Sequence, residues 1–275
     1  MTFDDYLLRW RLTPDGDPIR THSSRLLPVR RGSEPAMLKI SHVVEERRGP
    51  HIMRWWDGDG AARVLEFDGD AVLLERATGT GSLNAMAKTG DDDGATRILC
   101  EAVARLHEPR SAPLPDHLIP LNLWFQELAP AAERFGGILR LSDVIARELL
   151  AEPRDQVPLH GDIHHDNILD FGERGWLAID PKGLFGERGF DYGNIFTNPI
   201  ESDLPTEPDR FQARLANITE AAGMDRQRML RWIVAWCGLS AAWILLDGGG
   251  VDHEAAQALD VARIAARELE ELDLG

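Results

Sequence analysis

Three polar side chains in the middle of the chain have the types and spacings that phosphoryl transfer needs. Asp162 and Asn167 lie five residues apart within residues 159–169, and Asp180 follows thirteen residues after Asn167. When a nucleotide gives up a phosphoryl group, a carboxylate holds the acceptor hydroxyl in line, while a carboxamide and another carboxylate hold Mg²⁺ on the phosphates. Because Mg²⁺ keeps several of its waters, one Asn and one Asp are an adequate protein share of its shell. The set therefore favours a phosphotransferase.

The same segment permits a second chemistry. His160, Asp162, His164 and Asp166 alternate at every second residue, so an extended strand would place all four on one face. Such a face could hold two metal ions in a dinuclear hydrolase, since His and Asp are ordinary ligands for these ions. This alternative gives Asn167 and Asp180 no role, and so does a purely structural polar turn. The sequence favours the phosphotransferase over both.

The spacing around His-Gly-Asp at residues 160–162 is similar to that of the catalytic loop and metal-binding Asp of protein kinases. With Gly161 at its centre, it resembles the aminoglycoside phosphotransferase family. More narrowly, residues 159–168, 175–181 and 238–243 resemble the subgroup of streptomycin 6-kinases and hydroxyurea phosphotransferases. The resemblance implies an α+β, two-lobed, protein-kinase-like fold, with an N-terminal antiparallel sheet lobe and a larger, mainly helical C-terminal lobe.

The resemblance also implies site residues, with ATP and Mg²⁺ as cofactors. Asp162 would be the catalytic base, Asn167 and Asp180 would bind Mg²⁺, and Lys39, in the apolar strand 36–40, would contact the ATP phosphates. A Lys in such a strand could also simply extend its ammonium to solvent. Glu46 in an expected helix over residues 41–48 would orient Lys39, and Glu45 is an open alternative.

The remaining nucleotide contacts are expected from the N-terminal third of the chain. Strands are predicted near residues 7–12, 19–29, 36–40, 63–67 and 71–75, which together would form a five-stranded antiparallel sheet. No glycine-rich loop precedes Lys39. Ser23 and Ser24 occupy the expected place, and hydroxyl and backbone donors can bind phosphate without glycines. Glu75 and Ala77 lie where a kinase hinge pairs its backbone with adenine. The lobes are expected at residues 1–77 and 78–275.

The C-terminal part is helical by periodicity. Helices are predicted from Asp91 or Asp92 through Leu106, and over residues 120–135, 142–151, 207–222, 225–246 and 252–272. Trp232, Trp236 and Trp243 share one helix face and are interpreted as core. The resemblance implies that Asp191 begins a helix and hydrogen-bonds the backbone of the catalytic loop. The candidate acids for binding a cationic acceptor are Glu187, Asp191 and Asp247.

Composition narrows the class of protein. The chain has 275 residues, 43% hydrophobic and 28% charged, which is typical of a globular protein. Its formal charge of −16 argues against nucleic-acid binding and is compatible with a cationic small-molecule substrate. The N-terminus carries no apolar signal segment, and the longest apolar run, residues 232–246, is too short for a membrane span. Two distant cysteines, Cys100 and Cys237, indicate free thiols and a cytoplasmic location.

The sequence therefore predicts an ATP- and Mg²⁺-dependent O-phosphotransferase that acts on a hydroxyl of a small molecule, with streptomycin or a related aminoglycoside as the first candidate. Two alternatives share the fold: a kinase of ordinary metabolites, and a nucleotide-binding protein without catalytic activity. The acceptor, the choice between ATP and GTP, and the oligomeric state are left open.

Overall fold

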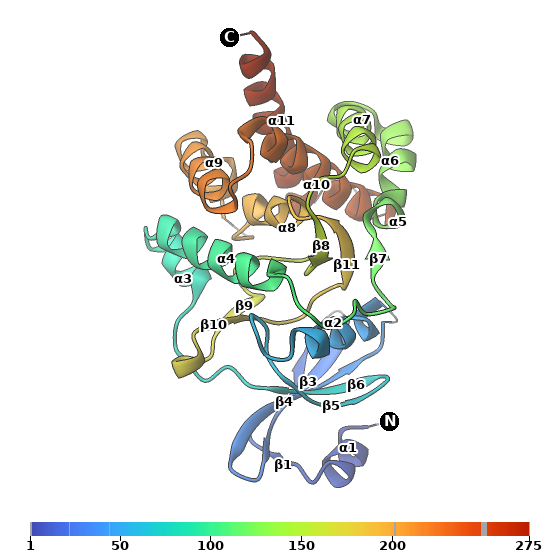
Figure 1. Ribbon diagram of the computed structural model, residues 1–275, viewed down its shortest axis with the longest axis vertical. Coiled ribbons are helices and arrows are strands. Elements are labelled where there is room, and N and C mark those ends of the chain that lie inside the picture. The colour runs from blue at the N-terminus through green and yellow to red at the C-terminus, as the bar shows by residue number, and fades with distance from the viewer. Residues whose placement is uncertain (1, 22, 44, 201, 249–251, 275) are drawn as a thin grey trace.

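The computed structural model describes residues 2–21, 23–43, 45–200, 202–248 and 252–274. The chain forms a sheet lobe at its N-terminal end and a larger, mainly helical part at its C-terminal end (Figure 1). In the described part of the chain, six strands form the antiparallel sheet, in the order β1-β3-β4-β6-β5 with β2 also paired to β3. Their bounds are β1 (Thr13–Pro14), β2 (Ile19–Arg20), β3 (Ser24–Arg31), β4 (Glu34–Ser41), β5 (Val64–Asp68) and β6 (Ala71–Glu75).

The first element is a helix, and the prediction of a strand over residues 7–12 was wrong. Helix α1 (Phe3–Arg9) begins at a capping box in which the Thr2 hydroxyl accepts from the Asp5 N–H and the Asp5 carboxylate accepts from the Thr2 N–H. Phe3, Tyr6, Leu7 and Trp10 recur at helical spacing and pack against the outer face of the sheet. In Figure 1, α1 lies at the end of the sheet lobe farthest from the helices.

The segment between β4 and β5 also differs from the prediction of a helix over residues 41–48. Strand β4 continues to Ser41, a short 3₁₀ helix η1 (Glu45–Arg47) follows, and helix α2 (Gly49–Trp56) begins where the earlier helix was expected to stop. Pro50 in the first turn of α2 costs no hydrogen bond, because an N–H there would have no intrahelical acceptor. A Cβ on Gly49 would lie 2.4 Å from the Pro181 carbonyl oxygen, so a glycine lets α2 approach the segment after Asp180.

The C-terminal part contains two small sheets besides its helices. Strands β7 (Ile119–Pro120), β11 (Leu184–Glu187) and β8 (Gln156–Leu159) form one, and the hairpin β9 (Ile168–Asp170) and β10 (Trp176–Ala178) forms the other. The helices are α3 (Leu83–Lys88), α4 (Asp92–His107), α5 (Leu121–Trp124), α6 (Leu128–Phe135), α7 (Ile138–Ala151), α8 (Phe190–Gly193), α9 (Pro208–Ala222), α10 (Arg226–Leu246) and α11 (His253–Leu274). Short 3₁₀ helices are η2 (Phe125–Glu127), η3 (Gly172–Arg174), η4 (Asn194–Thr197) and η5 (Leu204–Thr206). The helices predicted from periodicity over 91–106, 207–222, 225–246 and 252–272 are confirmed within a few residues.

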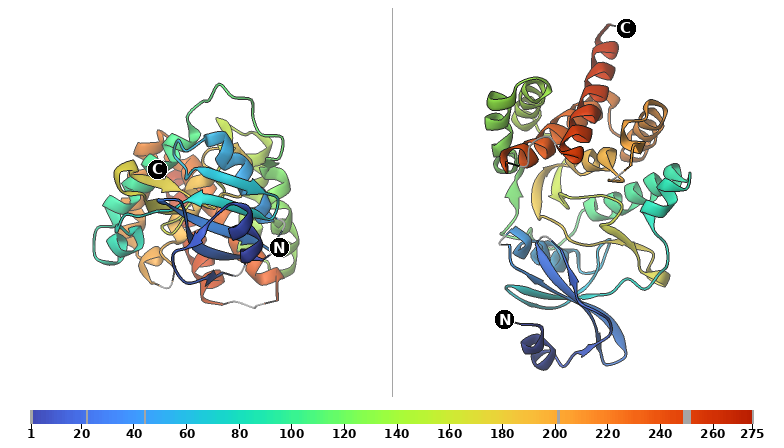
Figure 2. Two further views of the ribbon diagram at one scale, coloured as in Figure 1. Left: turned by 90° about the horizontal axis from the view of Figure 1, so that it is seen from below. Right: turned by 180° about the vertical axis from the view of Figure 1, so that it is seen from behind.

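Helix α10 forms the centre of the helical part. In the described chain it is the one helix long and apolar enough to cross a membrane, but 72% of its most apolar window is buried inside the fold. It packs against α7 and α11, as the view from behind in Figure 2 shows. Trp232 and Trp236 are buried, and Trp243 packs edge-to-face on Trp124 at 5.5 Å between ring centroids. The tryptophan stripe is therefore core, as predicted.

Candidate active site

A largely apolar pocket of about 270 Å³ lies between the inner face of the sheet and the β9–β10 hairpin. Residues Glu75–Ala77 line it, and so do Lys39 and Asp180. The Glu75 carboxylate is engaged with Arg174 and with the N–H of Arg63 at 2.7 Å, so it is not free to bind a ligand. The apolar side chains lining the pocket are those of Leu26, Met37, Leu74, Leu169, Phe171 and Ile179. These features suit a flat aromatic base with phosphates directed toward Lys39.

Lys39 extends from the inner face of β4, and its partner comes from η1. Its ammonium donates to Glu46 Oε2 at 2.6 Å and also contacts Asp180. The side chain of the alternative, Glu45, lies outside the described residues. Because η1 begins four residues after the end of β4, Glu46 lies beside Lys39, although η1 is a single turn and the predicted helix is absent.

The carboxylate of Asp191 binds the backbone of the catalytic loop that follows β8. Asp191, in the first turn of α8, accepts from the N–H of His160 at 2.9 Å and from that of Gly161 at 2.7 Å. His107 at the end of α4 contacts the same carboxylate at 2.8 Å. Asp191 is 1% exposed, so the structure supports the loop-holding role and contradicts its candidacy as an acceptor contact. Gly161 has φ +85°, a conformation that favours glycine.

Two other chain segments fix the side chain of Asp162. Asn194 in η4 donates from Nδ2 to Asp162 Oδ1 at 2.9 Å. On the opposite oxygen, Oδ2, lies the ammonium of Lys182 at 3.3 Å. His160 lies below, with Nε2 2.8 Å from the Ile179 carbonyl oxygen, so that nitrogen carries the proton. Burial lowers the pKa of His160, which keeps the ring neutral in this role.

Asn167 and Asp180 offer hard oxygen ligands at the edge of the pocket. Asn167 donates from Nδ2 to the Asp162 carbonyl oxygen at 2.8 Å, which leaves its Oδ1 for a cation. Asp180 has φ +62°, a strained conformation that turns its carboxylate toward Lys39. Burial raises the pKa of Asp180, but the ammonium groups of Lys39 and Lys182 outweigh burial and hold it below its usual range. The donor set fits Mg²⁺, and Lys39 supplies a positive charge at the same carboxylate.

The dinuclear hydrolase lacks its ligand cluster. Among the described residues, no three His, Cys, Asp or Glu side chains converge as a metal site. His160 Nε2 is directed at a backbone carbonyl, Asp166 pairs with Asn84 of α3, and His164 Nε2 is 3.9 Å from Asp162. The period-two alternation therefore does not produce a shared face.

Three further candidates have different outcomes. The Ser24 hydroxyl is buried 3.3 Å from that of Ser41, which contradicts a phosphate contact, whereas Ser23 is half-buried in the turn before β3 and stays a prediction. Glu187 is 1% exposed and bonded to Arg228 and Trp232, so its assignment to the acceptor was wrong. Asp247 ends α10 exposed to solvent, and its role is untested.

Sequence reasoning missed Lys182 and Asn194. Asn194 lies three residues after Asp191, a helical spacing that places both beside the catalytic loop. Lys182 follows Asp180 by two residues, so it could have been considered as part of the same loop. The division into lobes at residue 77 stays a prediction, because the inner face of the sheet shares one hydrophobic core with the helical part.

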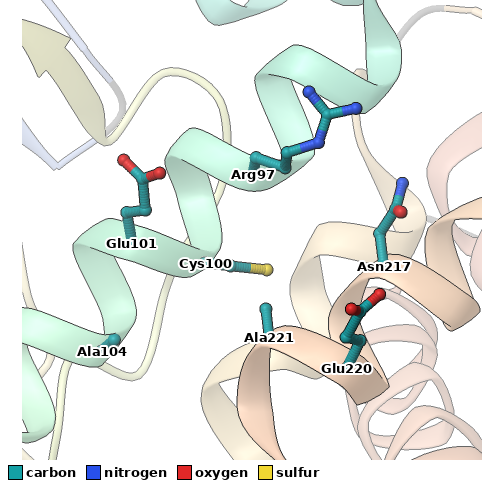
Figure 3. Close-up of a pocket in the computed structure, with 7 residues that line it drawn as sticks. All are labelled: Arg97, Cys100, Glu101, Ala104, Asn217, Glu220 and Ala221. Atoms are coloured by element: carbon teal, nitrogen blue, oxygen red, sulfur yellow. The ribbon is translucent and has the colours of Figure 1, made fainter.

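A second cavity, of about 400 Å³, lies between α4 and α9 and is shown in Figure 3. Its lining includes Cys100, Arg97 and Glu220, and none of the candidate site residues described above. Burial raises the pKa of the Cys100 thiol to about 12, so the thiol stays protonated. This cavity has no chemistry in common with the site around Asp162.

Comparison with known proteins agrees with this geometry. A family model described as aminoglycoside/hydroxyurea antibiotic resistance kinase matches residues 9–248. The chain is 53% identical over 266 residues to a streptomycin 3''-kinase of Klebsiella pneumoniae, covering 95% of this chain and 99% of that one. It is 33% identical to a streptomycin 6-kinase of Streptomyces griseus, covering 87% and 81%.

A solved structure supports the fold independently of close sequence similarity. The aminoglycoside phosphotransferase APH(4)-Ia superposes with a TM-score of 0.68 at 14% identity, covering 96% of this chain and 97% of that one. The predicted two-lobed, protein-kinase-like fold is thereby confirmed.

Proposed function

Because the chain belongs to the family of aminoglycoside/hydroxyurea antibiotic resistance kinases and is a phosphotransferase of hydroxyl groups, we propose that it phosphorylates streptomycin, with Mg²⁺-bound ATP as donor. The observation that carries the choice of acceptor is the 53% identity, over nearly the full length of both chains, to a streptomycin 3''-kinase. The hydroxyl at the 3'' position is accordingly the proposed site of transfer, ahead of that at position 6.

The proposed donor site is the apolar pocket beside Glu75–Ala77. Adenine would occupy the pocket, and the Lys39 ammonium, oriented by Glu46, would bind the phosphates. Bound Mg²⁺ would neutralise phosphate charge, and Asn167 and Asp180 are its proposed ligands. Asp162, fixed by Asn194, would orient the acceptor hydroxyl and receive its proton. Positioning and charge neutralisation then provide most of the rate.

The acceptor is proposed to be a cation, and the net charge of −16 supports this. Carboxylates bind guanidinium groups through paired hydrogen bonds, which strengthen where water is partly excluded. Both cysteines are free and buried, which fits the proposed location in the cytoplasm, where ATP is available.

The test is a panel of acceptors incubated with the purified protein and Mg²⁺-bound ATP. The panel contains streptomycin, other aminoglycosides, hydroxyurea and neutral sugar alcohols, and each is scored by mass spectrometry for the gain of one phosphate. We expect streptomycin to be modified, with two-dimensional NMR placing the phosphate at the 3'' position. Phosphate at position 6 would correct the regiochemistry alone. Phosphorylation of a neutral polyol, with all aminoglycosides inert at millimolar concentration, would contradict a cationic acceptor.

A further inference from the structure

Lys182 bridges the donor and acceptor sides of the site. Its ammonium donates to Glu46 Oε1 at 3.1 Å and lies 3.3 Å from Asp162 Oδ2, while Lys39 binds the other oxygen of Glu46 at 2.6 Å. Its backbone N–H donates to the His160 carbonyl oxygen at 2.7 Å, which fixes Lys182 to the catalytic loop. The Lys182 ammonium thus lies between the proposed phosphate site and the proposed base.

Lysine is a rare residue in this chain. Of its 30 basic residues, only Lys39, Lys88 and Lys182 are lysines, and the other 27 are arginines. Two of the three lysines therefore meet at one carboxylate in the site, whereas the third is exposed at the end of α3. A lysine places a compact, mobile point charge on a flexible stem, which can move between partners more readily than the planar guanidinium of arginine.

The charges of this cluster are unbalanced, so its ammonium groups have more carboxylate partners than they can neutralise. Two ammonium groups, of Lys39 and Lys182, face three carboxylates, of Glu46, Asp162 and Asp180, so the cluster carries a net charge of −1. The Lys182 ammonium contacts two of these carboxylates, that of Glu46 at 3.1 Å and that of Asp162 at 3.3 Å. A bound divalent cation would make the cluster net positive and bring it into balance with phosphate oxygens.

We propose that Lys182 is a catalytic residue whose ammonium leaves Asp162 and donates to a non-bridging oxygen of the phosphoryl group in transfer. This step rests on the proposed kinase function. The acceptor oxygen forms a bond to the γ-phosphorus, the bond from that phosphorus to the β,γ-bridging oxygen breaks, and its electron pair stays on ADP. The hydroxyl proton passes to Asp162 Oδ2, which the departure of Lys182 has exposed. Lys182 remains protonated and stabilises the charge that spreads over the phosphoryl oxygens.

A simpler role for Lys182 is to hold Glu46 and Asp162 in place without touching the phosphoryl group. The two roles differ in a binding measurement that needs no acceptor. Aluminium fluoride bound beside Mg²⁺-bound ADP imitates a phosphoryl group in transfer. A side chain that contacts the phosphoryl group therefore stabilises the aluminium fluoride complex but not the complex with ADP alone. We therefore measure ADP affinity by calorimetry with Mg²⁺, in the presence and absence of aluminium fluoride.

For the wild-type protein we expect aluminium fluoride to tighten ADP binding by about 100-fold, as transition-state analogues do. In Lys182→Met, ADP affinity alone should stay within about threefold of wild type, and the fluoride-dependent gain should fall to below about tenfold. The control Lys88→Met removes the exposed lysine and should keep the full gain. Where an acceptor is active, turnover of Lys182→Met should fall by about 10²–10³.

The result that would overturn the inference is an undiminished fluoride-dependent gain in a folded Lys182→Met protein, or no gain in the wild type. If the methionine variant fails to fold, Lys182→Gln is measured instead, because its amide keeps hydrogen bonds to Glu46 and Asp162 without the charge. Failure of streptomycin to react would contradict the proposed acceptor and leave this measurement interpretable, since it contains no acceptor.

Discussion

Two clusters of opposite charges in this molecule differ in their cations and in their exposure to solvent. In the first cluster, Lys39 and Lys182 face Glu46, Asp162 and Asp180 between the sheet and the catalytic loop. We call it the lysine cluster. The second, the arginine cluster, lies inside the helical part, where Arg228 donates from Nε to Glu187 at 2.8 Å and Trp232 donates to the same carboxylate at 2.7 Å.

The arginine cluster is complete, and the lysine cluster is not. The Glu187 carboxylate is 1% exposed and also accepts from the Arg154 N–H at 2.8 Å, while Arg228 donates onward to the Glu152 carbonyl oxygen. One positive charge meets one negative charge, and every oxygen of the carboxylate is occupied. The lysine cluster keeps one unbalanced negative charge and borders an open pocket. A satisfied pair holds structure together, whereas an unbalanced one is ready to receive ligands.

Replacing the proposed base, Asp162, should separate the two clusters most strongly. Asp162→Asn keeps the shape of the side chain, so Mg²⁺–nucleotide affinity should stay nearly intact while turnover falls by about 10²–10⁴. If Asp162 were a structural member like Glu187, the change would instead lower the free energy of unfolding and leave turnover in the folded fraction near normal. Calorimetry for nucleotide binding and ADP release with an active acceptor measure the two effects.

Removing the proposed metal ligands tests whether the lysine cluster receives Mg²⁺. Asn167→Ala and Asp180→Ala should each lower the apparent affinity for Mg²⁺-bound ATP by about 10–100-fold. The affinity is measured from the rise in unfolding temperature with ATP concentration in the presence of Mg²⁺. The neighbouring change His164→Ala is the matched control and should leave that stabilisation intact. A protein that carries stoichiometric zinc or iron, lost in His164→Ala, would contradict the assignment and revive the hydrolase.

His165 is a buried polar residue outside both clusters, and its burial makes the free energy of unfolding depend on pH. Its ring is 2% exposed, and neither nitrogen has a hydrogen-bond partner among the described residues. Burial, followed by the charges of Arg214 and Arg210, lowers its pKa to about 2 from an ordinary 6.5. The unfolded chain therefore binds a proton that the folded chain does not, and stability that is complete above pH 6.5 is lost as the pH falls toward 2.

The variant His165→Phe should accordingly match or exceed wild-type stability near pH 7.5, because it removes an unpaired polar ring. Its unfolding free energy should then fall less steeply in acid, by up to about 1.4 kcal/mol per pH unit below pH 6.5. Chemical denaturation at several pH values measures this. The exposed His253→Phe is the control and should follow the wild-type curve. A loss of more than about 2 kcal/mol in His165→Phe at every pH would contradict the interpretation that burial of an unpaired ring limits stability.

The comparison also explains what the sequence could predict. Asp162, Asn167 and Asp180 lie within nineteen residues, so their roles could be predicted from short-range spacing. The contact of Asp191 with the catalytic loop was predicted from the resemblance to the aminoglycoside phosphotransferase family. The helices over residues 91–106, 207–222, 225–246 and 252–272 were found because their apolar periodicity is long, whereas the helix expected over 120–135 is divided into α5, η2 and α6.

The failures have physical causes too. The apolar residues of segment 7–12 fit the two-residue period of a strand as well as the 3.6-residue period of a helix. Only the cap at Thr2 and the helical spacing that begins at Phe3 distinguish a helix. Gly49-Pro50 can end one helix or begin the next, and packing of Gly49 against Pro181 decides for the second. Glu187 was misassigned because its partner Arg228 lies 41 residues away, and no local pattern reveals such pairing. Lys182 was overlooked because its meaning depends on Glu46, 136 residues earlier.

The most direct test of the central claim measures one variant of each cluster side by side, for turnover with streptomycin and for the free energy of unfolding. Lys39→Met should lower turnover at least about 100-fold, and it should cost less stability than Arg228→Met, because Lys182 still pairs with Glu46 and the Asp180 side chain is partly exposed. Arg228→Met strands the buried carboxylate of Glu187, so it should cost about 3–5 kcal/mol of stability while the folded fraction keeps its turnover. Equal losses of turnover and of stability in both variants would contradict the division between a catalytic lysine cluster and a structural arginine cluster.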